Sequence, residues 1–127
     1  MTALAVALGG ALGALGRYGL GTWVQNSSRG DFPLGTMTVN LLGCLLLGFA
    51  ATWMDAISAS LAMKRFAMVG VLGAFTTFST YSFETLALLE QRLWSRAALY
   101  SLGSLGFGLV ALMIGMFLGG ILTQGRG

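Results

Sequence analysis

Four long apolar stretches restrict this chain more than any other feature of its sequence. They cover the approximate ranges 3–24, 34–54, 66–90 and 97–122. Each is long enough to cross the hydrocarbon core of a bilayer, which takes about 20 apolar residues in a helix. Because a membrane leaves no water for backbone polar groups, spans of this length must be helical. The sequence therefore predicts an all-α membrane protein with a single four-helix transmembrane domain over residues 1–127.

The composition excludes several other classes of protein. Only 9% of the residues are charged and 56% are hydrophobic, whereas soluble domains carry about 25% charged residues. The seven basic residues are scattered, so a nucleic-acid partner is not expected. One cysteine and no histidine exclude an intrachain disulfide and leave no metal-ligand cluster. In its apolar run, Cys44 is interpreted as a small hydrophobic side chain rather than a reactive thiol.

Glycines inside the spans indicate how the helices meet. Gly9 and Gly13 form one GxxxG pair, and Gly115 and Gly119 form another. Lipid gives helices no hydrophobic drive to associate, so small residues at close contacts must supply it. These pairs serve either packing within the chain or an oligomer interface, and the sequence leaves both open. A bundle of four short spans is too thin to enclose a polar pathway, which favours an oligomer.

The basic residues of the loops give no preferred orientation. In membrane proteins the cytoplasmic loops carry the excess of Lys and Arg. With four spans, one side receives Lys64, Arg65 and Arg126, and the other receives Arg29, Arg92 and Arg96. The equal count permits insertion in both orientations, and so an antiparallel dimer.

Polar side chains recur within three of the spans. The second span has Thr36 and Asn40 at i, i+4, and the fourth has Tyr100, Ser104 and Gly108 at i, i+4, i+8. The third concentrates its hydroxyls at Thr76, Thr77, Ser79, Thr80 and Ser82. Isolated Ser and Thr often bond to their own helix, so packing remains one interpretation. Three coordinated stripes favour a polar pathway through the membrane.

The chemistry of these stripes indicates a small anion. They contain an amide, hydroxyls and aromatic edges, all of which present positive hydrogens, and no carboxylate or cation. No base lies beside a possible nucleophile, which argues against an enzyme. Two charged residues fall inside spans, Arg17 in the first and Glu84 in the third, at similar depth. We expect Arg17 to reach the interface and Glu84 to border a polar vestibule, or the two to pair.

Three segments together resemble the Fluc/CrcB fluoride channels of prokaryotes. They are "GGALGALGRYGLG" (9–21), "PLGTMTVNLLG" (33–43) and "GAFTTFSTYSFET" (73–85). The likeness extends over nearly the whole chain in span number, order and loop length. It implies a fluoride-selective channel that passively exports fluoride across the prokaryotic cytoplasmic membrane and confers fluoride resistance. It also implies a third helix broken at its Thr/Ser-rich centre and an antiparallel, dual-topology dimer in the lipid bilayer.

The resemblance also implies the functional residues. Backbone carbonyls of Gly73 and Thr76, from both subunits, would hold one structural sodium ion at the dimer interface. The fluoride pathway would be lined by Asn40, Phe78, Tyr81, Tyr100 and Ser104.

The chain departs from the family pattern at four positions. Ala74 stands where the family usually has a second glycine, and Tyr81 stands where phenylalanine is common. Hydroxyls are expected where this chain has Gly108 and Leu112. These departures permit pairing with a second, paralogous subunit as well as a homodimer.

Two other interpretations come from different classes of protein. A proton-coupled exporter of the small multidrug resistance type also has four spans, but it needs a carboxylate in the first span. Here that span holds Arg17 and no acidic residue, which argues against exchange of protons for cationic drugs. An accessory membrane subunit without transport activity is the remaining alternative.

Overall fold

The computed structural model describes residues 2–28 and 30–123, and within those ranges it contains helices and no strands. Three helices are continuous: α1 (Thr2–Ser28), α2 (Leu34–Ala56) and α6 (Trp94–Thr123). The segment between α2 and α6 is composite, formed by α3 (Leu61–Lys64), the π-helical η1 (Arg65–Leu72), α4 (Gly73–Phe75) and α5 (Phe78–Glu90). Four segments are long and apolar enough to span a membrane. The prediction of an all-α protein with four spans is confirmed.

The helices extend beyond the apolar ranges expected from the sequence. The first continues to Ser28, the fourth begins at Trp94, and the third segment begins at Leu61. Polar residues can prolong a helix by bonding to its carbonyls: the Ser27 hydroxyl donates to the Trp23 carbonyl at 2.8 Å. Hydropathy marks the membrane-embedded part of a helix, not its hydrogen-bonded end.

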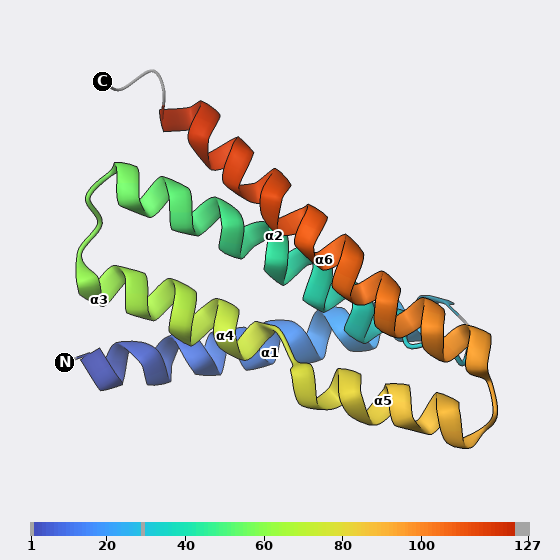
Figure 1. Cartoon of the computed structure of the whole chain (residues 1–127). Helices are drawn as coiled ribbons and strands as arrows, with labels where there is room; N and C mark the ends of the chain where they lie inside the picture. Colours follow the sequence, from blue (N-terminus) through green and yellow to red (C-terminus); the bar gives the residue numbers. More distant parts are fainter. Residues whose placement is uncertain (1, 29, 124–127) are drawn as a thin grey trace.

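The start of α1 and the end of α6 lie at the same end of the bundle as the α2–α3 connection (Figure 1). The α1–α2 and α5–α6 connections lie at the opposite end, as four crossings require. The helices α2 and α6 run side by side, and α1 packs along η1 and α4. Of the loop charges compared above, Arg29 and Arg126 lie outside the described residues.

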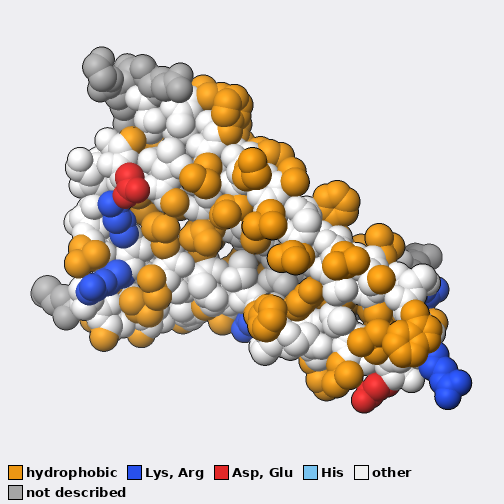
Figure 2. Space-filling model, in the orientation of Figure 1, with side chains coloured by type: hydrophobic (Ala, Val, Ile, Leu, Met, Phe, Trp, Pro, Cys, Tyr) orange, Lys and Arg blue, Asp and Glu red, His pale blue; other side chains and the backbone are white. Residues whose placement is uncertain are grey.

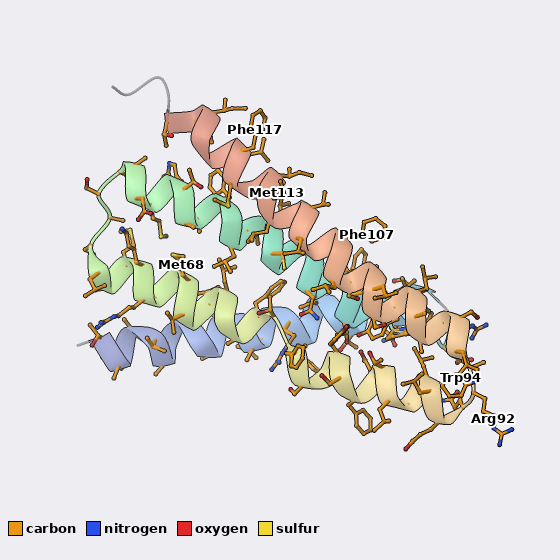
Figure 3. All side chains as sticks on the ribbon, viewed as in Figure 1. Met68, Arg92, Trp94, Phe107, Met113 and Phe117 are labelled. Atoms are coloured by element: carbon orange, nitrogen blue, oxygen red, sulfur yellow. The ribbon has the colours of Figure 1, made fainter. Side chains whose placement is uncertain are left out.

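The outward face of α6 is apolar. Side chains of α6 such as Phe107, Met113 and Phe117 point away from the bundle (Figure 3), and Met113 and Phe117 are each 68% exposed. Charged side chains gather near the two ends of the face shown in Figure 2, and Arg92 and Trp94 lie at the α5–α6 end in Figure 3. An apolar belt with charged ends suits a protein immersed in lipid.

Both glycine pairs lie at close contacts within the chain. A Cβ atom at Gly13 would collide with the Val71 carbonyl of η1, and one at Gly9 would collide with the Phe66 carbonyl. Likewise, a Cβ at Gly115 would collide with the Leu45 carbonyl of α2. These pairs let helix backbones touch, which is how spans associate in lipid. Packing within the chain, one of the two roles left open by the sequence, is confirmed for these glycines, and an oligomer interface stays a prediction.

We predict that Gly115→Ala destabilises the chain, because the added methyl group must separate α6 from the rigid backbone of α2. Overpacking of this kind costs about 1–3 kcal/mol. Gly120→Ala is the matched control, because a Cβ there has no atom within 4 Å. Thermal unfolding in detergent, followed by circular dichroism, should show a lower midpoint for Gly115→Ala alone. Equal midpoints for the two variants would contradict the contact.

Candidate functional site

The third membrane segment is interrupted between Phe75 and Phe78. The last helical residue of α4 is Phe75, and the next two residues are extended, with φ/ψ of −80°/157° at Thr76 and −147°/114° at Thr77. The Thr77 side chain caps α5: its oxygen accepts from the Thr80 amide at 3.3 Å, and its hydroxyl donates to the Thr80 hydroxyl at 2.9 Å. The cap satisfies an amide that has no helical partner at the start of α5.

Asn40 of α2 binds both backbone groups of Thr77. Its side-chain oxygen accepts from the Thr77 amide at 2.8 Å, and its side-chain nitrogen donates to the Thr77 carbonyl at 3.1 Å. An amide nitrogen carries two protons, and the described residues provide no partner for the second one. Asn40 therefore joins α2 to the interruption and keeps one donor uncommitted.

The side chains of Asn40 and Thr77 divert two backbone amides and so leave two backbone carbonyls without their helical donors. In a continuous helix, the Gly73 carbonyl would accept from the Thr77 amide and the Thr76 carbonyl from the Thr80 amide. Those amides donate instead to Asn40 and to the Thr77 hydroxyl. No backbone donor among the described residues replaces them. Two backbone oxygens are thus free to bind a ligand.

Thr77 lies between two cavities. The first, of about 570 Å³, is called here the Arg17–Glu84 cavity, because both of these side chains line it between α1, α2 and α5. The second, of about 430 Å³, is the Asn40–Ser104 cavity, which borders α2, α5 and α6. Thr77 is the one described residue that lines both. The interruption of the helix therefore separates two cavities, of which the Arg17–Glu84 cavity has charged side chains in its wall and the Asn40–Ser104 cavity has a mainly apolar wall with a few polar groups.

Four of the five predicted pathway residues line the Asn40–Ser104 cavity: Asn40, Phe78, Tyr81 and Ser104. The rings of Phe78 and Tyr81 are neighbours, with centroids 5.6 Å apart. The Tyr81 hydroxyl donates to the Ser101 carbonyl at 3.1 Å, so the extra hydroxyl of this chain joins α5 to α6. The Ser104 hydroxyl oxygen is buried and has no hydrogen-bond partner among the described residues.

Tyr100, the fifth predicted residue, lies outside both cavity linings. It is fully buried, and its hydroxyl donates to the Glu84 carboxylate at 2.6 Å. The other carboxylate oxygen accepts from the Thr36 hydroxyl at 2.9 Å. Glu84 thereby connects α2, α5 and α6. The Tyr100 hydroxyl is thus committed to Glu84, and the Tyr100 ring lies beside that of Tyr81 in the Asn40–Ser104 cavity wall, with centroids 5.4 Å apart.

Arg17 and Glu84 do not pair directly. Both line the Arg17–Glu84 cavity, as their expected common depth requires. Yet the ion pair found among the described residues is the one between Lys64 and Asp55, outside the cavities. Glu84 takes its hydrogen bonds from hydroxyls instead. The described lining of this cavity therefore combines one cation, Arg17, with two carboxylates, Asp31 and Glu84.

Thr77 was not singled out by the sequence analysis, although it contributes most of the local contacts. A signal was present: a threonine directly before a helical stretch is a typical N-cap. Its neighbours in the hydroxyl-rich segment concealed this position. The partners of Glu84 have no comparable signal, because they depend on how three helices pack.

The lining of the Asn40–Ser104 cavity determines what it can bind. Among its described residues it offers an amide proton, hydroxyls, a thiol and ring edges, and it has no charged side chain. Such a set can replace part of the hydration shell of a small anion. It cannot support acid–base or nucleophilic chemistry, because no base lies beside a nucleophile. Nor do the described residues bring together His, Cys, Asp or Glu side chains that could hold a metal ion.

Comparison with known proteins gives consistent matches over most of the chain. Residues 4–116 match the family model described as "CrcB-like protein, Camphor Resistance (CrcB)". A relative from Thermus thermophilus named "Fluoride-specific ion channel FluC" is 50% identical over 120 residues, which cover 94% of each chain. Proteins of the same name from Nitratidesulfovibrio vulgaris and Acidobacterium capsulatum are 47% and 43% identical. The match covers 86% and 94% of this chain, and 89% and 96% of theirs, respectively.

Proposed function

This chain belongs to the CrcB family, and we infer that it is a fluoride-specific ion channel and a multi-pass membrane protein. The observation that carries this conclusion is 50% identity to a fluoride-specific channel over 94% of the chain. The Asn40–Ser104 cavity supports it, because its lining offers donors and no fixed charge. Its relatives are named as channels, which agrees with the absence of a nucleophile–base pair around this cavity.

The proposed pathway follows the donors of that cavity. Fluoride is small and strongly hydrated, so its water must be replaced by donors spaced along the route. The free proton of the Asn40 amide and the unpartnered Ser104 hydroxyl are two such donors. Phe78 and Tyr81 add the positive edges of their rings. The Arg17–Glu84 cavity, which shares Thr77 with this route, would serve as the vestibule.

Transport in this proposal is passive export across the cytoplasmic membrane. A membrane potential that is negative inside favours the exit of an anion by about 2.3 kcal/mol per 100 mV. Export down this gradient would lower cytoplasmic fluoride and confer resistance. No coupling proton is needed, because no carboxylate of the described residues lines the Asn40–Ser104 cavity.

We propose further that the active unit is an antiparallel dimer. In the single chain, Phe78 is 79% exposed, and Ser79, Thr80 and Ser82 of α5 are also exposed. The Ser79 and Thr80 hydroxyls lie 3.4 Å and 2.9 Å from that of Thr77, and Ser82 donates to the Phe78 carbonyl at 2.9 Å. Even with these partners, a polar surface at membrane depth is costly against lipid. A second copy placed over α5 would cover these hydroxyls and complete the cavity wall. The equal loop charges permit the opposite insertion that such a dimer needs, although a paralogous partner would satisfy the same surface.

The dimer would bring the freed carbonyls of two chains together around a structural sodium ion. The carbonyls of Gly73 and Thr76 supply two oxygens per chain, and Gly73 is exposed on the surface of the single chain. Backbone carbonyls without other donors suit a hard cation, since a cation satisfies orphan oxygens at membrane depth. When bound, the ion would add positive charge near the pathway and join the two subunits.

The function is tested by fluoride efflux from liposomes that contain this chain alone, measured with a fluoride electrode. We expect efflux that follows the membrane potential and requires no pH gradient. Vesicles without protein set the background, and chloride efflux measures selectivity. Exchange of a cationic drug for protons would favour the small multidrug resistance type of exporter. Absence of any transport by intact, folded protein would favour an accessory subunit.

Asn40→Asp tests the proposed pathway. The change nearly preserves shape but replaces the free donor with a charged acceptor. A like charge about 4 Å from fluoride costs about 4 kcal/mol at an effective dielectric constant of about 20, which corresponds to roughly a thousandfold in rate. Asn40→Ser keeps one donor and should conduct more than Asn40→Asp. Efflux must be compared in preparations with equal unfolding midpoints, because Asn40 also holds Thr77. If Asn40→Asp conducts within a few-fold of the parent, Asn40 does not line the fluoride pathway, and its role is limited to binding the Thr77 backbone.

An experimental structure of the reconstituted protein tests the dimer and the sodium ion together. We expect two antiparallel chains with density between four carbonyls, from Gly73 and Thr76 of each chain. Thr76→Ser is the control, because the proposed ligand is the backbone oxygen and should survive the change. Parallel chains, or hydrogen-bonded water among these oxygens, would contradict the proposal.

A further inference from the structure

The polar stripe of α6 ends at Ser104. Tyr100 and Ser104 are followed at the same spacing by Gly108, which has no side chain to continue the stripe. On α2, the corresponding stripe runs Thr36, Asn40 and Cys44 at i, i+4, i+8. The two helices run side by side, so one stripe can continue where the other ends.

The thiol of Cys44 lies at the gap in the α6 stripe. Gly108 is buried, and a Cβ atom built there would lie 3.5 Å from the Cys44 sulfur, in ordinary contact. Cys44 therefore borders the space that a side chain at position 108 would enter. A thiol can donate its proton, although more weakly than a hydroxyl.

A second observation points to a ligand beside this thiol. Cys44 and Ser104 line the same cavity together with Asn40. The Ser104 oxygen is buried in that cavity wall and has no partner among the described residues. A buried polar group without a partner is rare in folded proteins and calls for a bound species to complete its hydrogen bonds. The cavity that contains the Cys44 thiol is thus one where something is expected to bind.

We propose that Cys44 is a wall residue of the fluoride pathway, and that its thiol is the donor that follows Ser104 where the α6 stripe ends at Gly108. The proposal rests on the function inferred above and deepens it. The polar route crosses from α6 to α2 at this level instead of descending along α6. It follows that the same thiol is a binding site for soft, thiophilic metal ions, and that occupation of this site closes the route.

Methylmercury chloride tests the proposal on the reconstituted full chain. The thiol sulfur forms a bond to mercury, the S–H and Hg–Cl bonds break, and a proton and chloride are released, with no change of oxidation state. The chain has one cysteine and no histidine, so the reagent has a single thiol target. Because the bulky group would fill a narrow anion route, fluoride efflux should fall by about tenfold or more.

Three variants provide the controls. Cys44→Ala should slow untreated efflux by about threefold, since a weak donor is lost, and Cys44→Ser should restore it with a stronger donor. Both should be insensitive to methylmercury relative to their own untreated rates. Ala62→Cys in the Cys44→Ala background places an exposed thiol on α3, away from both cavities. Its labelling should leave efflux unchanged.

The outcomes separate this inference from the function on which it rests. Absence of fluoride efflux in untreated vesicles overturns the proposed function before the reagent is added. Efflux that persists after mass spectrometry shows one mercury per chain at Cys44 overturns the pathway role of the thiol. So does a Cys44 that remains unlabelled under conditions that label Ala62→Cys.

Discussion

The structure depends on the two hydrogen bonds between the Asn40 side chain and the backbone of Thr77. An interrupted helix at membrane depth exposes amides and carbonyls that water cannot reach, and each unsatisfied group is costly. A side-chain amide can donate from its nitrogen and accept at its oxygen at the same time. Asn40 supplies the partner that the Thr77 amide needs and a further donor to the Thr77 carbonyl, and Thr77 in turn caps α5. Without this arrangement, the Thr77 amide would have no partner at membrane depth.

The remaining features of the site follow from this contact. It fixes α2 against the start of α5, and so it places Thr77 on the wall of both cavities. It takes the Thr77 amide away from the Gly73 carbonyl, while the cap takes the Thr80 amide away from that of Thr76. The Glu84 carboxylate, bound by hydroxyls of Thr36 and Tyr100, holds the far part of α5 to α2 and α6. The start of α5 is thereby held to α2 by Asn40, and its later part is held to α2 and α6 by Glu84.

The sequence was sufficient for features set by length and helical period. Apolar length predicted the four spans, and the i, i+4 spacing predicted a polar face on the second and on the fourth span. The family resemblance, not the spacing, implied that Asn40 and Ser104 belong to one pathway, and both line one cavity. The partner of Tyr100 could not be predicted in this way, because a stripe gives a face and not the neighbour that covers it. The π-helical geometry of η1 had no sequence signal either. It lies where α1 approaches closely at Gly9, Gly13 and Gly70, a contact between segments distant in the sequence.

The double engagement of Asn40 has a further consequence for ion passage. If the amide rotated away, the Thr77 amide would lose its partner, at a cost of about 1–3 kcal/mol, while the Thr77 carbonyl would keep the first hydrogen bond of α5. The amide is therefore preorganised: its remaining proton keeps one direction whether or not an ion is present. An anion that sheds its water here meets a donor that needs no reorientation, so no reorganisation energy of this side chain is added to the barrier at each passage.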